Sequence, residues 1–215
     1  MSNSVDLDVN PLQWVVSAFQ SSTNLYIEIQ NFQRMGKFPE IKGRDLLNEL
    51  RDLNETLDAL GKVFSPLKEV LDTSVFDFSK LENPLHTCGK ACEDFKHQIE
   101  QSSSTSVWNN IRYWNRIQIM GDKVDHFQQL LCGYKMAFAI VIMDVDRRND
   151  PAIAAHPGYK PLIKATRDKI SALIQHNKDF LVARISPDAT TLRLQQTEMS
   201  SLRNCLEFCD IAEAS

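Results

Sequence analysis

Apolar residues recur in steps of three and four over most of this chain, which is the spacing that places side chains on one face of a helix. Two long stripes are the clearest examples. The first comprises Leu46, Leu50, Leu53, Leu57, Leu60, Phe64, Leu67 and Leu71, and the second Met120, Val124, Phe127, Leu131, Tyr134, Phe138, Val141 and Val145. Stripes of this length predict long helices that pack side by side with these residues in the core.

The segment that follows Asn10 predicts a helix with an unusual surface. Asn10 can cap it, and Pro11 suits the first helical position. Its apolar residues form two opposite stripes, one of Leu12, Val15, Val16, Phe19 and Tyr26 and the other of Trp14, Ala18, Leu25 and Phe32. Glu28 is its only charged residue before Gln33. Such a helix is typically buried on both sides at the centre of a bundle; the alternative is a segment that contacts a membrane or a partner.

Breaker residues separate these helices from several others. A turn is expected at 35–39 (MGKFP), and Pro66 predicts a kink or a restart of the second helix. Asn83-Pro84 repeats the favourable helix start and opens a third helix, while Ser186-Pro187 separates two helices near the end of the chain. The segment 147–161 (RRNDPAIAAHPGYKP) holds three prolines and is the expected main linker.

We therefore predict an all-α protein, an antiparallel bundle of about six helices. The expected organisation is a helical bundle over residues 1–148, a linker over 149–161, and a C-terminal helical pair over 162–215 that packs on or extends the bundle. With 215 residues, of which 43% are hydrophobic and 24% charged, the chain can bury a sizeable core without disulfides or metals.

The charge balance argues against a nucleic-acid partner. The net charge is -4, and the isoelectric point is about 5.7. Nucleic-acid binders usually carry a basic stripe, whereas the longest basic cluster here is Arg147-Arg148.

The cysteines and the first residues predict a location in a reducing compartment. The five cysteines are Cys88, Cys92, Cys132, Cys205 and Cys209. The first residues (MSNSVDLDVN) contain neither the basic nor the apolar run of a signal peptide. Together with the odd number of cysteines, this indicates reduced thiols that are buried as small hydrophobic side chains. The longest apolar run, Met136 to Val145, is half of the ~20 residues that a spanning helix needs. We expect a soluble, cytoplasmic protein.

One group of residues has the composition of a metal site but the wrong geometry. His86, Cys88, Cys92 and His97 occur within one predicted helix. At ~100° per residue, the two cysteines share one face and the two histidines lie nearly opposite, so the four side chains cannot converge on one ion. We predict no metal at this segment.

Other polar residues also favour ordinary structural roles. Asp144, Asp146 and Asp150, next to Arg147 and Arg148, are expected to form a solvated helix end, since acids two apart point to different faces.

Two further histidines are isolated from other candidate reactive groups. His126 and His176 occur alone on amphipathic helices, where solvent exposure is the usual outcome. Phosphate-binding loops, nucleophile elbows and zinc-protease motifs do not occur in the sequence. We therefore predict no catalytic residue and no cofactor.

Several stretches resemble a family of fungal N-terminal domains, the HeLo-like domains at the head of STAND receptors, also named after the azaphilone pigment biosynthesis cluster protein L. These stretches are PLQWVVSAFQSSTNLYIEIQNF, LLNELRDLNETLDAL, CGKACEDF, MGDKVDHFQQLLCGYKMAFAIVIMDV and MSSLRNCLEFCDIA, and they cover nearly the whole chain. The resemblance implies a HeLo-like helical bundle in a fungal cytoplasmic protein. It also implies an effector or adaptor module, some relatives of which act on membranes through the first helix.

The first function that follows is a non-catalytic interaction protein. Its expected partner is another protein, either a helical partner or a pathway enzyme, with peripheral membrane contact through the first helix as a variant. The candidate contact residues are Leu12, Trp14, Val15, Phe19 and Tyr26.

Two alternatives remain open. One is an accessory or regulatory protein of a fungal secondary-metabolite pathway of the azaphilone-pigment type. The other is a helical enzyme or a ligand carrier with an apolar pocket, lined by Trp108, Trp114 and Tyr134.

Overall fold

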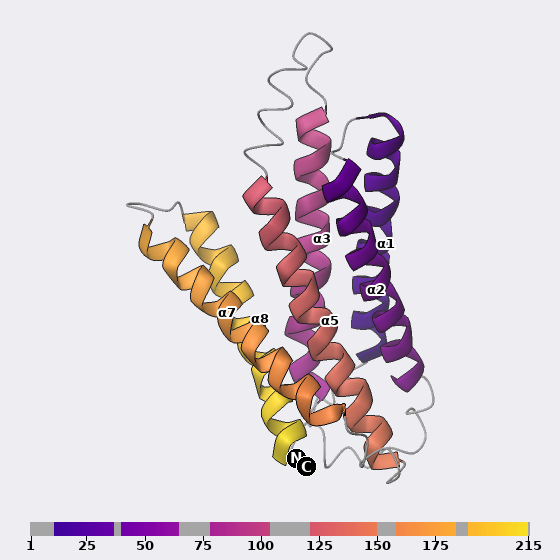
Figure 1. The fold of residues 1–215 in the computed structure, drawn as a ribbon, viewed down its shortest axis with the longest axis vertical. Coiled ribbons are helices and arrows are strands. Elements are labelled where there is room, and N and C mark those ends of the chain that lie inside the picture. The colour runs from indigo at the N-terminus through magenta and orange to yellow at the C-terminus, as the bar shows by residue number, and fades with distance from the viewer. Residues whose placement is uncertain are drawn as a thin grey trace, which may run out of the picture.

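The computed structural model describes almost entirely helical residues, and Figure 1 shows their arrangement. The described ranges are 11–36, 40–64, 78–103, 121–149, 158–183 and 189–214. The elements are α1 (Pro11–Arg34), α2 (Glu40–Phe64), the 3-10 helix η2 (Phe78–Leu81), α3 (Glu82–Ser103), α5 (Gly121–Asn149), α7 (Tyr159–Ala183) and α8 (Ala189–Ala214). Within these ranges no strand occurs, and the all-α prediction is confirmed.

The end of α1 shows how the local sequence sets a boundary. Gly36 adopts a left-handed backbone with φ of 66°, a conformation that glycine reaches without steric cost. The amide of Met35 donates to the carbonyl oxygen of Asn31 at 3.1 Å, which satisfies one of the last carbonyl groups of the helix. The predicted turn is therefore confirmed at Met35 and Gly36, while 37–39 lie outside the described residues.

The helices pack around one main core (Figure 1). The pairs α1/α2, α5/α7 and α7/α8 run antiparallel, whereas α1/α3, α2/α5 and α5/α8 run parallel. Helix α1 contacts α2 and α3, and α5 contacts α2, α7 and α8. Helices α7 and α8 form a pair that packs against α5, and α8 also contacts α3. The C-terminal pair thus covers the side of α3 and α5 that α1 and α2 leave open.

The predicted stripes supply this core. The buried members of the two long stripes are Leu46, Leu50, Leu53, Leu57, Leu60, Phe64, Val124, Phe127, Leu131, Tyr134, Phe138, Val141 and Val145. Leu67, Leu71 and Met120 lie outside the described residues. Helical periodicity alone therefore identified most of the core of α2 and α5.

Helix α1 is buried on one side only, unlike the helix at the centre of a bundle that its two stripes suggested. One face, with Val15, Ala18 and Leu25, is buried against α2 and α3. Val16 and Ile27 on the other face are 45% and 49% exposed. The physical reason is the position of α1 at the edge of the bundle, where its described contacts are with α2, α3 and η2.

Some boundaries differ from those expected. Helix α5 continues to Asn149 and α7 starts at Tyr159, so both ends of the predicted linker are helical. Helix α7 tolerates Pro161 in its first turn, because the backbone amides of the first turn have no hydrogen-bond partner within the helix.

Helix α5 is more apolar than the length of its uncharged run suggested. By length and composition alone, the segment Lys123–Arg148 could cross a membrane, and it is the one such helix among the described residues. In the folded chain 56% of the 18-residue window that meets this criterion is buried inside the bundle. The central helix of a soluble bundle meets the same criterion, and α5 is such a helix because it contacts α2, α3, α7 and α8.

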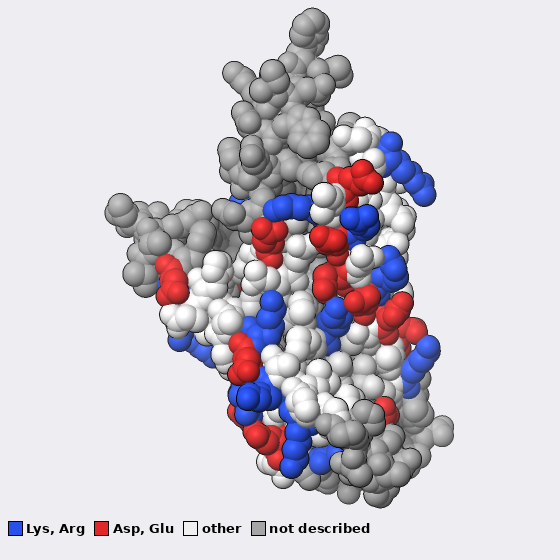
Figure 2. Space-filling model, in the orientation of Figure 1, with Lys and Arg blue, Asp and Glu red and all other residues white. Residues whose placement is uncertain are grey.

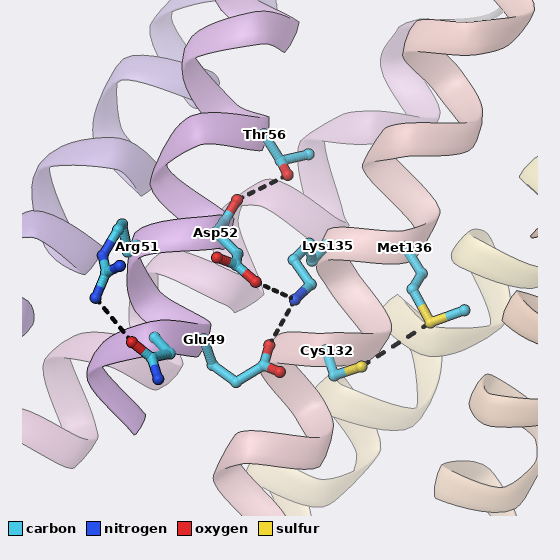
Figure 3. Close-up of polar contacts among 8 residues, drawn as sticks. Glu49, Arg51, Asp52, Thr56, Cys132, Lys135 and Met136 are labelled. Atoms are coloured by element: carbon cyan, nitrogen blue, oxygen red, sulfur yellow. Dashed lines mark hydrogen bonds and ion pairs between the residues drawn. The ribbon is translucent and has the colours of Figure 1, made fainter. Parts of the chain in front are cut away.

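A charged contact joins α2 to α5 at the margin of this core (Figure 3). The ammonium group of Lys135 donates to Glu49 at 2.9 Å and to Asp52 at 3.0 Å. Burial by itself would lower the pKa of Lys135, but the hydrogen bonds to both carboxylates outweigh it and the pKa is raised. Lys135 therefore stays charged and orients α5 along α2.

Candidate functional site

The predicted contact residues of α1 do not share one environment. Val15 is 2% exposed and belongs to the core, so this folded state does not present it to a partner. Leu12, Trp14 and Tyr26 are partly buried and pack against the core. Phe19, at 36% exposure, is the candidate that this fold displays most openly.

The exposed apolar residues of α1 form a stripe of their own, which we call the α1 outer face: Val16, Phe19 and Ile27. These residues are separated by three and eight positions, so they follow one side of the helix. Met35 and Ile41, near the turn into α2, are further exposed apolar residues, at 64% and 67% exposure.

The α1 outer face lacks the charges that other parts of the surface carry. Glu28 and Arg34 are the only charged residues of α1. In contrast, acidic and basic side chains are interspersed over the face drawn in Figure 2, where α2 and α5 lie in front. A largely uncharged face with large exposed apolar side chains is typical of an interaction surface.

The histidines and cysteines of α3 lie on opposite sides of the helix, as their spacing predicted. Cys88 and Cys92 are buried, whereas His86 and His97 are exposed. His97 contacts the carboxylate of Glu100 at 3.1 Å. In the described part of the chain, no group of three or more potential ligands is placed to hold a metal ion.

All five thiols are free, and most of them are shielded from solvent. Cys132 is partly exposed and the other four are buried. A hydrogen bond between the Cys92 thiol and Cys88, together with burial, raises the pKa of Cys92, and burial raises the pKa of Cys205 and of Cys209, the latter to about 11. Raised pKa values keep these groups as neutral thiols at physiological pH, where they are poor nucleophiles.

The expected solvated helix end at the acids of α5 is wrong for Asp144. This residue is 1% exposed and accepts hydrogen bonds from Arg147 at 3.0 Å and from Arg148 at 2.8 Å. The hydroxyl of Tyr159 also donates to it at 3.3 Å, and the guanidinium of Arg147 lies 5.3 Å from the Tyr159 ring centre. Helix α7 covers this end of α5, so Asp144 joins the two helices instead of facing solvent.

Tyr134, one of the three residues expected to line an apolar pocket, is a core residue in this fold. Its side chain is buried, and its hydroxyl lies 2.8 Å from that of Ser201 on α8. Burial raises its pKa well above the ordinary value. Trp108 and Trp114, the other expected lining residues, lie outside the described residues.

A cavity of about 590 Å³ lies elsewhere, lined by α3, α5, α7 and α8; we call it the four-helix cavity. At the end of the molecule where this cavity lies, α7 and α8 diverge from α3 and α5 (Figure 1). Phe95 of α3 and Phe127 of α5 stack at its wall, with ring centres 4.3 Å apart and planes 6° apart. Leu194, which is 44% exposed, lines it from α8.

The polar side of this cavity contains the two histidines that were expected to stand alone. The rings of His126 and His176 stack with centres 5.5 Å apart. His126 Nε2 lies 3.3 Å from Glu198 Oε1, and the buried amide of Asn177 donates to the same oxygen. The spacing of residues within one helix could not show that His126 and His176, on two different helices, lie together. Asn177 lies four positions after Leu173 on the apolar stripe of α7, and a polar residue at such a position indicates a buried hydrogen bond.

Comparison with known proteins gives one match. The family model of the pigment biosynthesis cluster protein PigL N-terminal region matches residues 3–210. No curated protein and no solved structure matches the chain.

Proposed function

From its membership of the pigment biosynthesis cluster protein PigL N-terminal family, to which this chain belongs, we propose that it is a non-catalytic interaction protein of a pigment-type biosynthetic pathway. In this proposal it binds an apolar helix of another protein, such as a pathway enzyme, through the α1 outer face. The exposure of Val16, Phe19 and Ile27 is the observation that carries the proposal.

The energetics of α1 support a binding role for these side chains. Its opposite face already packs against α2 and α3, so the exposed residues are not needed to attach the helix to the bundle. Covering Val16 and Ile27 with a partner would remove apolar surface from water, which is favourable by about 25 cal/mol per Å². A partner helix can lie along α1, because apolar residues spaced by three and four on one helix suit the groove of another.

The charge pattern favours a protein partner over a membrane surface. Helices that lie on membranes usually carry lysine and arginine around their apolar face, since these attract anionic lipids. The one basic residue of α1 is Arg34, in its last turn. Nothing on α1 therefore provides the electrostatic attraction that would concentrate the chain at a lipid surface.

The proposal is tested in the organism that carries the gene. The gene is deleted and replaced with a Val16→Glu/Ile27→Glu variant, and the coloured and secreted metabolites are profiled against the parent strain. We expect the deletion to reduce one metabolite family, and the double variant to reproduce that loss at a normal protein level. Two buried charges at the interface would cost more than the apolar contacts contribute.

The control is Ala165→Glu, which adds one glutamate, half of the charge of the double variant, at an exposed position of α7. It should restore the parent metabolite profile. Neither the control nor the double variant should change the thermal midpoint of the purified protein. Restoration by the double variant would contradict the role of the α1 outer face. Vesicle co-sedimentation that the double variant abolishes would favour the membrane instead, and accumulation of a single precursor in the deletion strain would favour an enzyme.

A further inference from the structure

We propose that His126 and His176 together bind one divalent transition-metal ion, such as Zn²⁺, which links α5 to α7. Their imidazole rings come from two different helices and lie with their centres 5.5 Å apart. Imidazole nitrogens are common ligands of zinc, copper and nickel. Both side chains line the four-helix cavity, the side chain of His126 is 28% exposed and His176 is exposed, so an ion can reach them from solvent.

The separation of the two rings suits a shared ion. A zinc ion about 2.1 Å from one nitrogen of each ring would lie about 3.2 Å from each ring centre. At a tetrahedral angle the two ring centres would then be about 5.2 Å apart, which is close to the observed 5.5 Å. The ring planes differ by 30°, and the exposed His176 has room to turn one nitrogen toward His126.

Glu198 orients His126 as carboxylates orient metal-binding histidines. His126 Nε2 lies 3.3 Å from Glu198 Oε1, and the buried amide of Asn177 donates to the same oxygen. A neutral His126 that donates from Nε2 keeps an unprotonated Nδ1, which is then the nitrogen that binds the ion. A histidine ligand typically donates its second nitrogen to a carboxylate in this way, which fixes the ring and makes it a stronger ligand.

Water completes the coordination of the ion. Among the described residues, no histidine, cysteine or carboxylate completes a group of three around an ion. The cavity of about 590 Å³ beside the two histidines has room for the water molecules that take the other positions. Two protein ligands hold zinc less tightly than the three or four of typical zinc sites, so the ion exchanges with the solution.

An ion at this position would tie together the end of the molecule where α7 and α8 diverge from α3 and α5 (Figure 1). It would join His126, near the start of α5, to His176, near the end of α7. This inference goes beyond the proposed function and does not depend on it, because α1 contributes no residue to the cavity lining. The α1 outer face and the metal site can therefore fail separately.

The test titrates the full chain, without a histidine tag, with Zn²⁺ by isothermal titration calorimetry under reducing conditions. We expect saturable binding of one ion per chain. His126→Gln and His176→Gln should each weaken it at least tenfold, because the ion then keeps one imidazole. Glu198→Gln should weaken it about tenfold or more, because it loosens the ring of His126. The matched control is His97→Gln, which removes an exposed histidine that also contacts a glutamate, at 3.1 Å, and should leave binding unchanged.

The thiols are tested separately, because they also bind zinc. Cys132→Ser removes the one partly exposed thiol and should leave the affinity unchanged. X-ray absorption spectroscopy of the zinc complex should show imidazole nitrogen and water oxygen neighbours and no sulfur. Thermal midpoints without zinc show whether each variant is folded.

Several outcomes would overturn the proposal. One is the absence of saturable binding, and another is an equal loss of affinity in His97→Gln and the variants of His126 and His176. A sulfur neighbour in the absorption spectrum, or binding that Cys132→Ser abolishes, would place the ion at a thiol instead.

Discussion

Among single residues, Asp144 shows most clearly how burial changes the structural role of a charged side chain. Its carboxylate is almost fully enclosed, and Arg147 and Arg148 donate to its two different oxygens. Tyr159 brings a third donor from α7. A carboxylate removed from water in this way is stabilised only while its partners remain in place.

Replacing Asp144 with alanine should therefore lower the free energy of unfolding by about 3–5 kcal/mol, because two guanidinium groups lose their partly buried partner. Urea unfolding followed by circular dichroism measures this change. Asp146→Ala is the matched control, since Asp146 lies on the same helix and is partly exposed. An equal decrease in the free energy of unfolding in both variants would show that the buried Asp144 contributes no more to stability than the partly exposed Asp146.

At the scale of helices, the contact between α1 and α3 depends on the absence of a side chain. A Cβ atom added to Gly89 would lie 3.2 Å from the Cα atom of Ala18, which is closer than ordinary packing allows. The neighbouring Ser21 donates to Glu93 at 2.8 Å and ties the same two helices together. The backbones of α1 and α3 thus approach each other closely at this point.

A pair of glycine substitutions tests this close approach. Gly61→Ala in α2 should raise stability by up to about 1 kcal/mol, because alanine favours the helix and its Cβ would meet Val15 at an ordinary 3.6 Å. Gly89→Ala gains the same helix propensity but must push α1 away from α3. We expect its free energy of unfolding to lie at least about 1 kcal/mol below that of Gly61→Ala. Equal values from chemical denaturation would mean that α1 shifts at no cost.

At the scale of the whole molecule, buried weak acids are spread over several helices and are held neutral. The pKa values of Cys92, Cys205 and Tyr134 are raised, the first mainly by its hydrogen bond with Cys88 and the other two by burial. Burial also raises the pKa of Cys209 from 9.0 to about 11 and that of Tyr159 from 10.0 to about 12. The folded state therefore retains protons that the unfolded chain releases in alkali.

Stability should consequently be lost as the pH rises. Between pH 9 and 11 the unfolded chain loses the Cys209 proton while the folded chain keeps it, so unfolding becomes more favourable through this window. The thermal midpoint, measured from pH 7 to 11 with a reducing agent present, should stay level below pH 9 and fall above it. Cys209→Ala should make the decline shallower. A midpoint that stays constant to pH 11 would contradict the link between burial and these pKa values.

Local patterns were sufficient for much of the architecture. The leucine stripe of α2 and the apolar stripe of α5 predicted buried faces correctly, because helical spacing alone brings such residues to one side. The turn at Gly36 and the start of α1 at Pro11 also follow from the conformations that these two residues prefer.

The sequence by itself determined the helices, the residues that share a face within each of them, and the opposed positions of the histidines and cysteines on α3. Only the tertiary structure decided which apolar stripe of α1 is covered, that α7 buries Asp144, and that His126 meets His176 beside a cavity. The physical reason is range. Periodicity reports contacts within one helix, whereas burial and hydrogen bonding depend on which other helix packs alongside, and that choice involves residues far apart in the chain.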